Sequence, residues 1–163
     1  MKRLILMRHA KSDWGDPTLP DHARPLNKRG RRSAAALGAW LRAEGLVPNE
    51  ILCSPATRTR QTCALLRLPL APCLVDSLYM AGPEDMLAVL RAAHADTVLM
   101  IGHNPGIAEF AARLLAAPPD HPRFDDYPTG ATLVADFAVS DWAMLKEGTG
   151  HAARFVIPRD LPA

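Results

Sequence analysis

Two basic side chains directly follow an apolar run near the start of the chain. Residues 4–7 read LILM, which is typical of a buried strand, and Arg8 and His9 come immediately after it. A charge beside the core has to be solvated or paired. The position therefore indicates either an ordinary strand end that surfaces into water or a site where a bound anion completes the pair.

Two later segments place the same residue types at equivalent positions. Arg58 comes shortly after the predicted short strand 50–54, EILCS, and His103 follows the apolar segment 98–101. In an open parallel sheet, ligands bind outside the carboxyl ends of the strands, so we expect both arginines and both histidines at one sheet edge. Because the planar fork of arginine can hold two oxygens of a phosphate at once, this set predicts a phosphate pocket.

Other polar residues close to these segments are secondary candidates. Ser12 and Asn104 are expected as additional phosphate contacts. Arg24, in the segment ARPLNKRG, is expected either near the mouth of the pocket or simply solvated on a loop, as most arginines are. Helix starts after Ser54 and Asn104 would add free backbone N–H groups, which favour an anion.

Strands and helices alternate along the chain in a pattern that could hold these residues in place. The predicted helices begin at Asn27 and Ser54 as N-caps, with Pro55 at the first helical position of the second helix and Gly45 as the stop of the first. The remaining expected elements are strands at 4–7, 50–54, 73–75, 98–101, 131–137 and 153–157, a helix at 82–94 and a helix opened by Pro105.

This alternation predicts an α/β fold, a three-layer sandwich with a mostly parallel central sheet and helices on both faces. The length of 163 residues fits one domain covering 1–163. The segment 117–130 contains four prolines and shows no periodicity, so we expect a surface loop that borders the site.

Composition restricts the classes of partner. The net charge is only +2, so an anion site has to be local, and no apolar run approaches the length of a membrane span. The three cysteines lack a CxxC spacing, which favours reduced thiols in a cytoplasmic protein. Aromatic residues make up only 6% of the chain, so the basic segment 27–32, NKRGRR, is interpreted as a solvated helix start rather than a nucleic-acid site.

Rival chemistries are less compatible with the residue spacing. A cysteine phosphatase requires five residues between its cysteine and arginine, but only four separate Cys53 from Arg58. Metal-binding patterns such as HExxH are missing from the sequence, so we expect no metal or other cofactor. A non-catalytic phosphate-binding protein would not need His9 and His103 together, and their presence favours an enzyme.

Three motifs occur in the order found in one known family. RHA at 8–10, SPATRTRQT at 54–62 and GHNPG at 102–106 resemble the histidine phosphatase superfamily, also called phosphoglycerate-mutase-like. Together with MRHAKSDW and RPLNKRGRRSA in so short a chain, they look most like its SixA-type branch, which is associated with phosphohistidine phosphatase activity. Ala10 replaces the glycine of the wider family's Arg-His-Gly triplet, a departure shared by this branch.

The resemblance implies a role for each matching residue. His9 would be the nucleophile that takes the phosphoryl group and forms a phosphohistidine intermediate, which water then hydrolyses. Arg8, Arg58 and His103 would hold the phosphoryl oxygens, so that no metal is needed.

The leaving group is the open question. An ordinary phosphate ester needs a general acid, and Asp76 is the nearest match to the glutamate of the mutase-like relatives. The alternative is that Asp76 simply points into water at a strand end. An imidazole leaving group needs no such acid, so we expect a protein phosphohistidine as the substrate, with small phosphorylated metabolites as the alternative.

Overall fold

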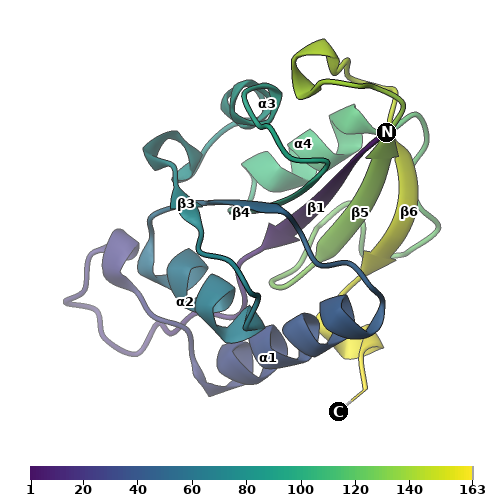
Figure 1. Ribbon diagram of the computed structural model, residues 1–163. Helices are drawn as coiled ribbons and strands as arrows, with labels where there is room; N and C mark the ends of the chain where they lie inside the picture. Colours follow the sequence, from purple (N-terminus) through teal and green to yellow (C-terminus); the bar gives the residue numbers. More distant parts are fainter. Residues whose placement is uncertain (163) are drawn as a thin grey trace.

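The computed structural model describes residues 1–162 and is built around a six-stranded sheet in the order β3-β2-β4-β1-β5-β6 (Figure 1). The first four strands in this order are mutually parallel, whereas β5 is antiparallel to β1, and β6 is antiparallel to β5. Their bounds are β1 (Lys2–Arg8), β2 (Glu50–Cys53), β3 (Cys73–Leu74), β4 (Thr97–Gly102), β5 (Thr132–Phe137) and β6 (His151–Val156).

Helices cover both faces of this sheet, with α1 and α2 on one face and α3 and α4 on the other (Figure 1). Their bounds are α1 (Lys28–Ala43), α2 (Thr57–Leu66), α3 (Pro83–Arg91) and α4 (Gly106–Leu114). The predicted α/β sandwich with a mostly parallel sheet is therefore confirmed.

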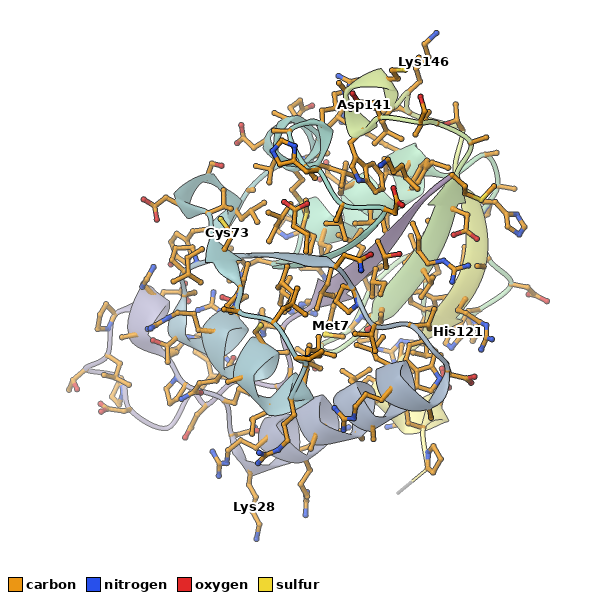
Figure 2. The ribbon with its side chains drawn as sticks, in the orientation of Figure 1. Met7, Lys28, Cys73, His121, Asp141 and Lys146 are labelled. Atoms are coloured by element: carbon orange, nitrogen blue, oxygen red, sulfur yellow. The ribbon has the colours of Figure 1, made fainter. Side chains whose placement is uncertain are left out.

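The continuous apolar run of β1 is explained by burial on both faces. Successive side chains of a strand point to opposite faces, so Leu4 and Leu6 pack under α3 and α4 while Ile5 and Met7 pack under α1 and α2. Figure 2 shows Met7 between the sheet and these two helices, and Lys28 extending away from α1 into solvent. The buried strand thus delivers the residues that follow it to a fixed place at the sheet edge.

The first helix has the predicted ends and the second does not. Asn27 accepts a hydrogen bond from the backbone of Gly30 and caps α1, and Gly45 adopts a positive φ just after its end. The prediction that Ser54 caps α2 and that Pro55 is its first residue is wrong, since the helix starts at Thr57. The hydroxyl oxygen of Ser54 instead accepts a hydrogen bond from His103.

A glycine allows α1 to approach the loop that leaves β1. A Cβ at Gly30 would overlap the backbone carbonyl oxygen of Lys11, so no larger residue fits without a backbone shift. The backbone N–H of Asn27 donates to the same carbonyl at 3.0 Å. This contact fixes the path of the chain just after His9.

No helix within residues 1–162 is long and apolar enough to cross a membrane.

Candidate active site

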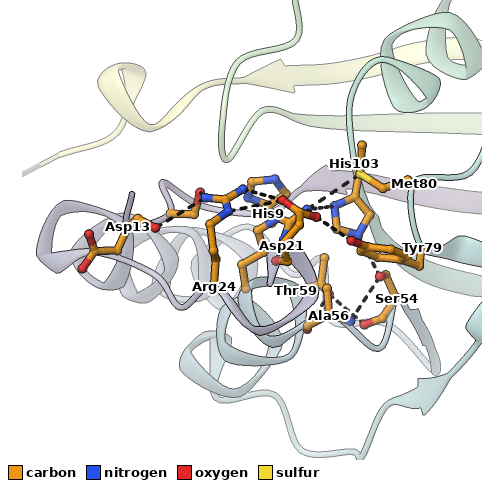
Figure 3. Close-up of polar contacts among 12 residues, drawn as sticks. His9, Asp13, Asp21, Arg24, Ser54, Ala56, Thr59, Tyr79, Met80 and His103 are labelled. Atoms are coloured by element: carbon orange, nitrogen blue, oxygen red, sulfur yellow. Dashed lines mark hydrogen bonds and ion pairs between the residues drawn. The ribbon is translucent and has the colours of Figure 1, made fainter. Parts of the chain in front are cut away.

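The predicted residues meet at the carboxyl ends of β1, β2 and β4, around a cavity of about 220 Å³ (Figure 3). Arg8 is the last residue of β1 and His9 follows it. Ser54 follows β2, Arg58 lies in the first turn of α2, and His103 follows β4. The lining residues are Arg8, His9, Lys11, Ser12, Trp14, Asp21, Arg24, Arg58, Met80, His103, Asn104 and Thr129. The sequence therefore placed both arginines and both histidines at the correct sheet edge.

His9 is buried, with 5% of its surface exposed, and its tautomer follows from its hydrogen bond. Nδ1 lies 2.7 Å from the carbonyl oxygen of Ala10, which can only accept, so Nδ1 carries the proton and Nε2 keeps its lone pair. Burial lowers the pKa of His9 to about 3, and the charge of Arg8 contributes to this shift. At neutral pH the ring is uncharged and can act as a nucleophile through Nε2.

His103 lies opposite His9, with the two ring centroids 5.4 Å apart. A guanidinium N–H of Arg58 donates to its Nδ1 at 3.3 Å, so Nε2 carries the proton and donates to the hydroxyl oxygen of Ser54 at 2.7 Å. Burial, followed by the positive charge of Arg58, lowers the pKa of His103 to about 4. A phosphoryl dianion next to this ring would raise that pKa and favour a proton on Nδ1.

The two arginines each retain a buried N–H group that has no partner in residues 1–162. These groups are the Nε atoms of Arg8 and Arg58. Burial and the charge of Arg58 both lower the pKa of Arg8, so the cavity brings two cations close together at an energetic cost. Buried donors are normally hydrogen-bonded, and two unpaired donors beside a pair of like charges are the arrangement expected at an anion site.

Sequence reasoning missed Asp21, which is the centre of the polar network. One oxygen of its carboxylate lies 3.0 Å from Arg58 Nη2 and accepts a hydrogen bond from the hydroxyl of Tyr79 (Figure 3). The other oxygen lies 3.1 Å from Arg24 Nη2. The hydrogen bond from Tyr79 lowers the pKa of Asp21 most, and with the help of Arg58 it falls to about 2. Asp21 is therefore ionised at neutral pH and orients both arginines.

Arg24 and Ser12 lie in the pocket wall, as one of the sequence expectations had it. Arg24 is only 7% exposed, and its Nη1 donates to the hydroxyl oxygen of Ser12 at 2.6 Å. The exposed ring of Trp14 stacks on its guanidinium group, 3.5 Å from the ring centroid. These contacts hold Arg24 at the mouth of the cavity rather than leaving it solvated.

Asn104 lines the cavity but its amide group is committed to a loop. Its Nδ2 donates to the carbonyl oxygens of Asp126 and Tyr127, at 2.9 and 3.1 Å. Arg8 Nη1 donates to the same carbonyl of Tyr127 at 3.2 Å. The proline-rich segment 117–130 thus borders the site, as predicted, whereas the donors of Asn104 anchor that segment instead of pointing free into the cavity.

The structure does not bring Asp76 to the cavity. It begins a short 3-10 helix, Asp76–Leu78, that follows β3, and it is exposed. This placement matches the alternative reading of a carboxylate that points into water. The acidic residue that the cavity does contain, Asp21, lies in the short 3-10 helix Asp21–Ala23 before α1, and no spacing in the sequence relates it to Arg58.

The remaining letters of the SPATRTRQT motif support the backbone around His9. The hydroxyl of Thr62 accepts from the backbone N–H of Ala10 at 3.0 Å, and the side-chain oxygen of Gln61 accepts from that of Leu26 at 2.8 Å. The motif thus places Arg58 in the cavity, and one turn later its Gln61 and Thr62 side chains bind the backbone of the segments next to His9 and α1. Residues 1–162 contain no group of three or more His, Cys, Asp or Glu side chains placed to hold a metal ion.

Comparisons with known proteins give a consistent family. The model of the histidine phosphatase superfamily (branch 1) matches residues 4–76. An uncharacterized protein of Mycobacterium tuberculosis (strain H37Rv) is 33% identical over 160 residues, which cover 94% of this chain and 100% of the relative. A solved structure assigned as the phosphohistidine phosphatase SixA of Nakamurella multipartitia is 31% identical, covers 96% of each chain and has a TM-score of 0.84.

A second solved structure, the protein histidine phosphatase SixA complexed with tungstate, shares the fold at lower identity. It is 21% identical, with a TM-score of 0.79 over 97% of this chain and 98% of that chain. The fold that these two solved structures share with the chain confirms the predicted phosphoglycerate-mutase-like architecture.

Proposed function

Since the chain belongs to the histidine phosphatase superfamily and to its SixA-type branch, we propose that this phosphatase removes phosphate from protein phosphohistidine through an intermediate on His9. The observation that carries the proposal is the neutral, buried ring of His9, whose Nε2 is free while both arginines and His103 surround it. A neutral imidazole with a free lone pair is a competent nucleophile.

In the proposed reaction, Nε2 of His9 attacks phosphorus in line with the bond to the substrate's imidazole nitrogen. The new P–N bond forms as the old one breaks, and the substrate ring leaves as a neutral imidazole because it enters protonated on its other nitrogen. Arg8 and Arg58 hold the phosphoryl oxygens and offset the charge that moves between the two rings. Water then attacks phosphorus, releases inorganic phosphate and restores neutral His9.

The acid content of the cavity supports phosphohistidine over an ordinary ester. Asp21 is the one carboxylate among residues 1–162 that lines the cavity, and a pKa of about 2 leaves it without a proton to donate at neutral pH. An alkoxide leaving group requires a proton donor, whereas a protonated imidazole departs without one. We therefore infer that alkyl phosphates are poor substrates. We also propose that the steps run without a metal ion, because Arg8 and Arg58 supply the positive charge that a metal ion would otherwise supply.

The intermediate is tested by trapping it. The enzyme is mixed with a protein that carries ³²P-phosphohistidine, quenched in base and digested, and the labelled peptide is identified. We expect base-stable, acid-labile phosphate on His9, no label in the variant His9→Ala, and normal labelling in the control His151→Ala, which removes an exposed histidine of β6. Label on another residue would refute the assignment of His9.

Turnover measurements test the rest of the proposal. Arg8→Ala and Arg58→Ala should each lower kcat about a hundredfold, as expected for the loss of one preorganised donor to the transition state. EDTA should leave the rate unchanged. A kcat/KM that is higher for a small alkyl phosphate than for the phosphohistidine protein would instead favour a phosphomonoesterase of small metabolites.

A further inference from the structure

A second cavity, of about 390 Å³, lies next to the active site and shares Arg8, Lys11 and Thr129 with it. We call it the flanking cavity. It is formed by the loop after β1, the start of α1, the segment 117–130 and the short 3-10 helix Pro158–Asp160. Its lining residues are Arg8, Lys11, Arg29, Ser33, Arg123, Asp126, Pro128, Thr129, Ile157, Pro158 and Arg159.

The charge of this lining is strongly one-sided. Five of its residues are basic and one, Asp126, is acidic. Asp126 is already paired with Arg123 at 2.8 Å. Lys11, Arg29 and Arg159 form no ion pair with any side chain in residues 1–162. The cavity therefore concentrates positive charge in a chain whose net charge is only +2.

This concentration of positive charge is not neutralised by other side chains in residues 1–162. The three unpaired cations come from separate elements, so their side chains converge through the fold and not through a local run of basic residues. Like charges that face one concave surface repel each other, and a bound anion relieves this repulsion. The lining contains no aromatic side chain, so it offers no stacking platform for a nucleic-acid base.

Arg8 connects the two cavities. This residue lines both, and its buried Nε has no partner within residues 1–162. An anion in the flanking cavity and a phosphoryl group beside His9 would therefore lie on two sides of one arginine, within reach of a single short segment of substrate.

We propose that the flanking cavity binds a second anionic group of the substrate and that, given the function proposed above, this group is an Asp or Glu carboxylate next to the phosphohistidine in the substrate protein. The active site supplies the chemistry and the flanking cavity supplies the preference for an acidic neighbour. Because the charges are partly exposed, the preference weakens at high salt.

The test compares two phosphohistidine peptides that differ only in acidic residues beside the phosphohistidine, Asp and Glu in one and Asn and Gln in the other. We expect about a tenfold higher kcat/KM for the acidic peptide at low salt, through a lower KM, and a much smaller ratio at 0.5 M NaCl. Arg29→Gln and Arg159→Gln should each reduce this ratio by about two- to fivefold, the range of a single partly exposed ion pair.

Arg32→Gln is the matched control, because Arg32 is an exposed arginine of the same helix as Arg29 and does not line the flanking cavity. It should keep the full ratio. Equal kcat/KM values for the two peptides would overturn the proposed function of the flanking cavity and leave the phosphohistidine activity intact. The same conclusion would follow if Arg32→Gln reduced the ratio as much as Arg29→Gln and Arg159→Gln do.

A separate arm keeps the cavity testable if the proposed substrate is wrong. p-Nitrophenyl phosphate and its analogue with a ring carboxylate need no phosphohistidine, and their kcat/KM ratio reports on the flanking cavity alone. A preference for the carboxylate analogue that falls in Arg159→Gln, in an enzyme that hydrolyses neither peptide, would support an anion site but overturn its assignment to acidic proteins. No preference in either pair would overturn the anion site itself.

Discussion

Lowering the pH from 7 to 5 should destabilise the folded chain, because the two active-site histidines are buried as neutral rings. The pKa of His9 lies near 3 and that of His103 near 4, whereas both rings titrate near 6.5 in the unfolded chain. Between these values the unfolded chain binds more protons than the folded one. The contribution of these two neutral rings to the free energy of unfolding is therefore fully present above pH 6.5. It is lost as the pH falls toward their pKa values in the folded chain.

The magnitude follows from the size of the gap at pH 5. Each ring is almost fully protonated in the unfolded chain and almost fully neutral in the folded one, which amounts to about 2 kcal/mol per ring. The two rings together should lower the free energy of unfolding by about 4 kcal/mol, a large share of the 5–15 kcal/mol that is typical of a domain.

Urea denaturation at pH 7 and pH 5 measures this loss directly. In His9→Gln about half of it should disappear, since only His103 then resists protonation, and comparing each variant with itself at two pH values cancels any general destabilisation. His151→Gln, at an exposed position of β6, should keep the whole loss. If His9→Gln showed the same loss of unfolding free energy between pH 7 and pH 5 as the unmodified chain, the low pKa of His9 in the folded chain would be refuted.

Three further outcomes follow from the contacts. Gly30→Ala should lower the free energy of unfolding by about 1–3 kcal/mol in urea denaturation, because its Cβ would overlap a backbone carbonyl, whereas Gly82→Ala, whose Cβ meets only a flexible side chain at 3.5 Å, should have little effect. Asp21→Asn should lower kcat/KM about tenfold for aryl and alkyl phosphates alike, since it loosens Arg58; a selective loss for alkyl phosphates would make Asp21 a proton donor. Asp76→Asn should leave both rates within about twofold, and a collapse with alkyl phosphates alone would return the acid role to Asp76.

The sequence predicted those parts of the site that depend on strand ends. Arg8 and His103 each follow an apolar run, and the edge of a parallel sheet brings such positions together regardless of the conformation of the loops. Arg58 could be placed because helical side chains lean toward the N-terminus of their helix. These inferences use only local pattern and the geometry of parallel strands, and both are encoded within a few residues.

The contacts that sequence reasoning missed join segments distant in the chain. Asp21 contacts Arg58 across 37 residues and Tyr79 across 58, and nothing in the composition of these segments indicates that they meet. Ser54 has the residue type and position of an N-cap, but His103 binds its hydroxyl, so tertiary contact overrides the local signal. Such pairings become visible only when the loops have been placed in space.

Asp21 also sets the charge that an incoming phosphoryl group meets. Four cationic side chains, those of Arg8, Lys11, Arg24 and Arg58, line the cavity, and its single carboxylate offsets one of their charges. With both histidines neutral, the lining carries three positive charges, one more than the two negative charges of a phosphoryl dianion. A fourth charge, from a protonated His9, would bind product phosphate more tightly and would remove the nucleophile at the same time. The depressed pKa values of the two rings and the ionised Asp21 therefore serve the same balance, in which the site attracts phosphate strongly enough to react and weakly enough to release it.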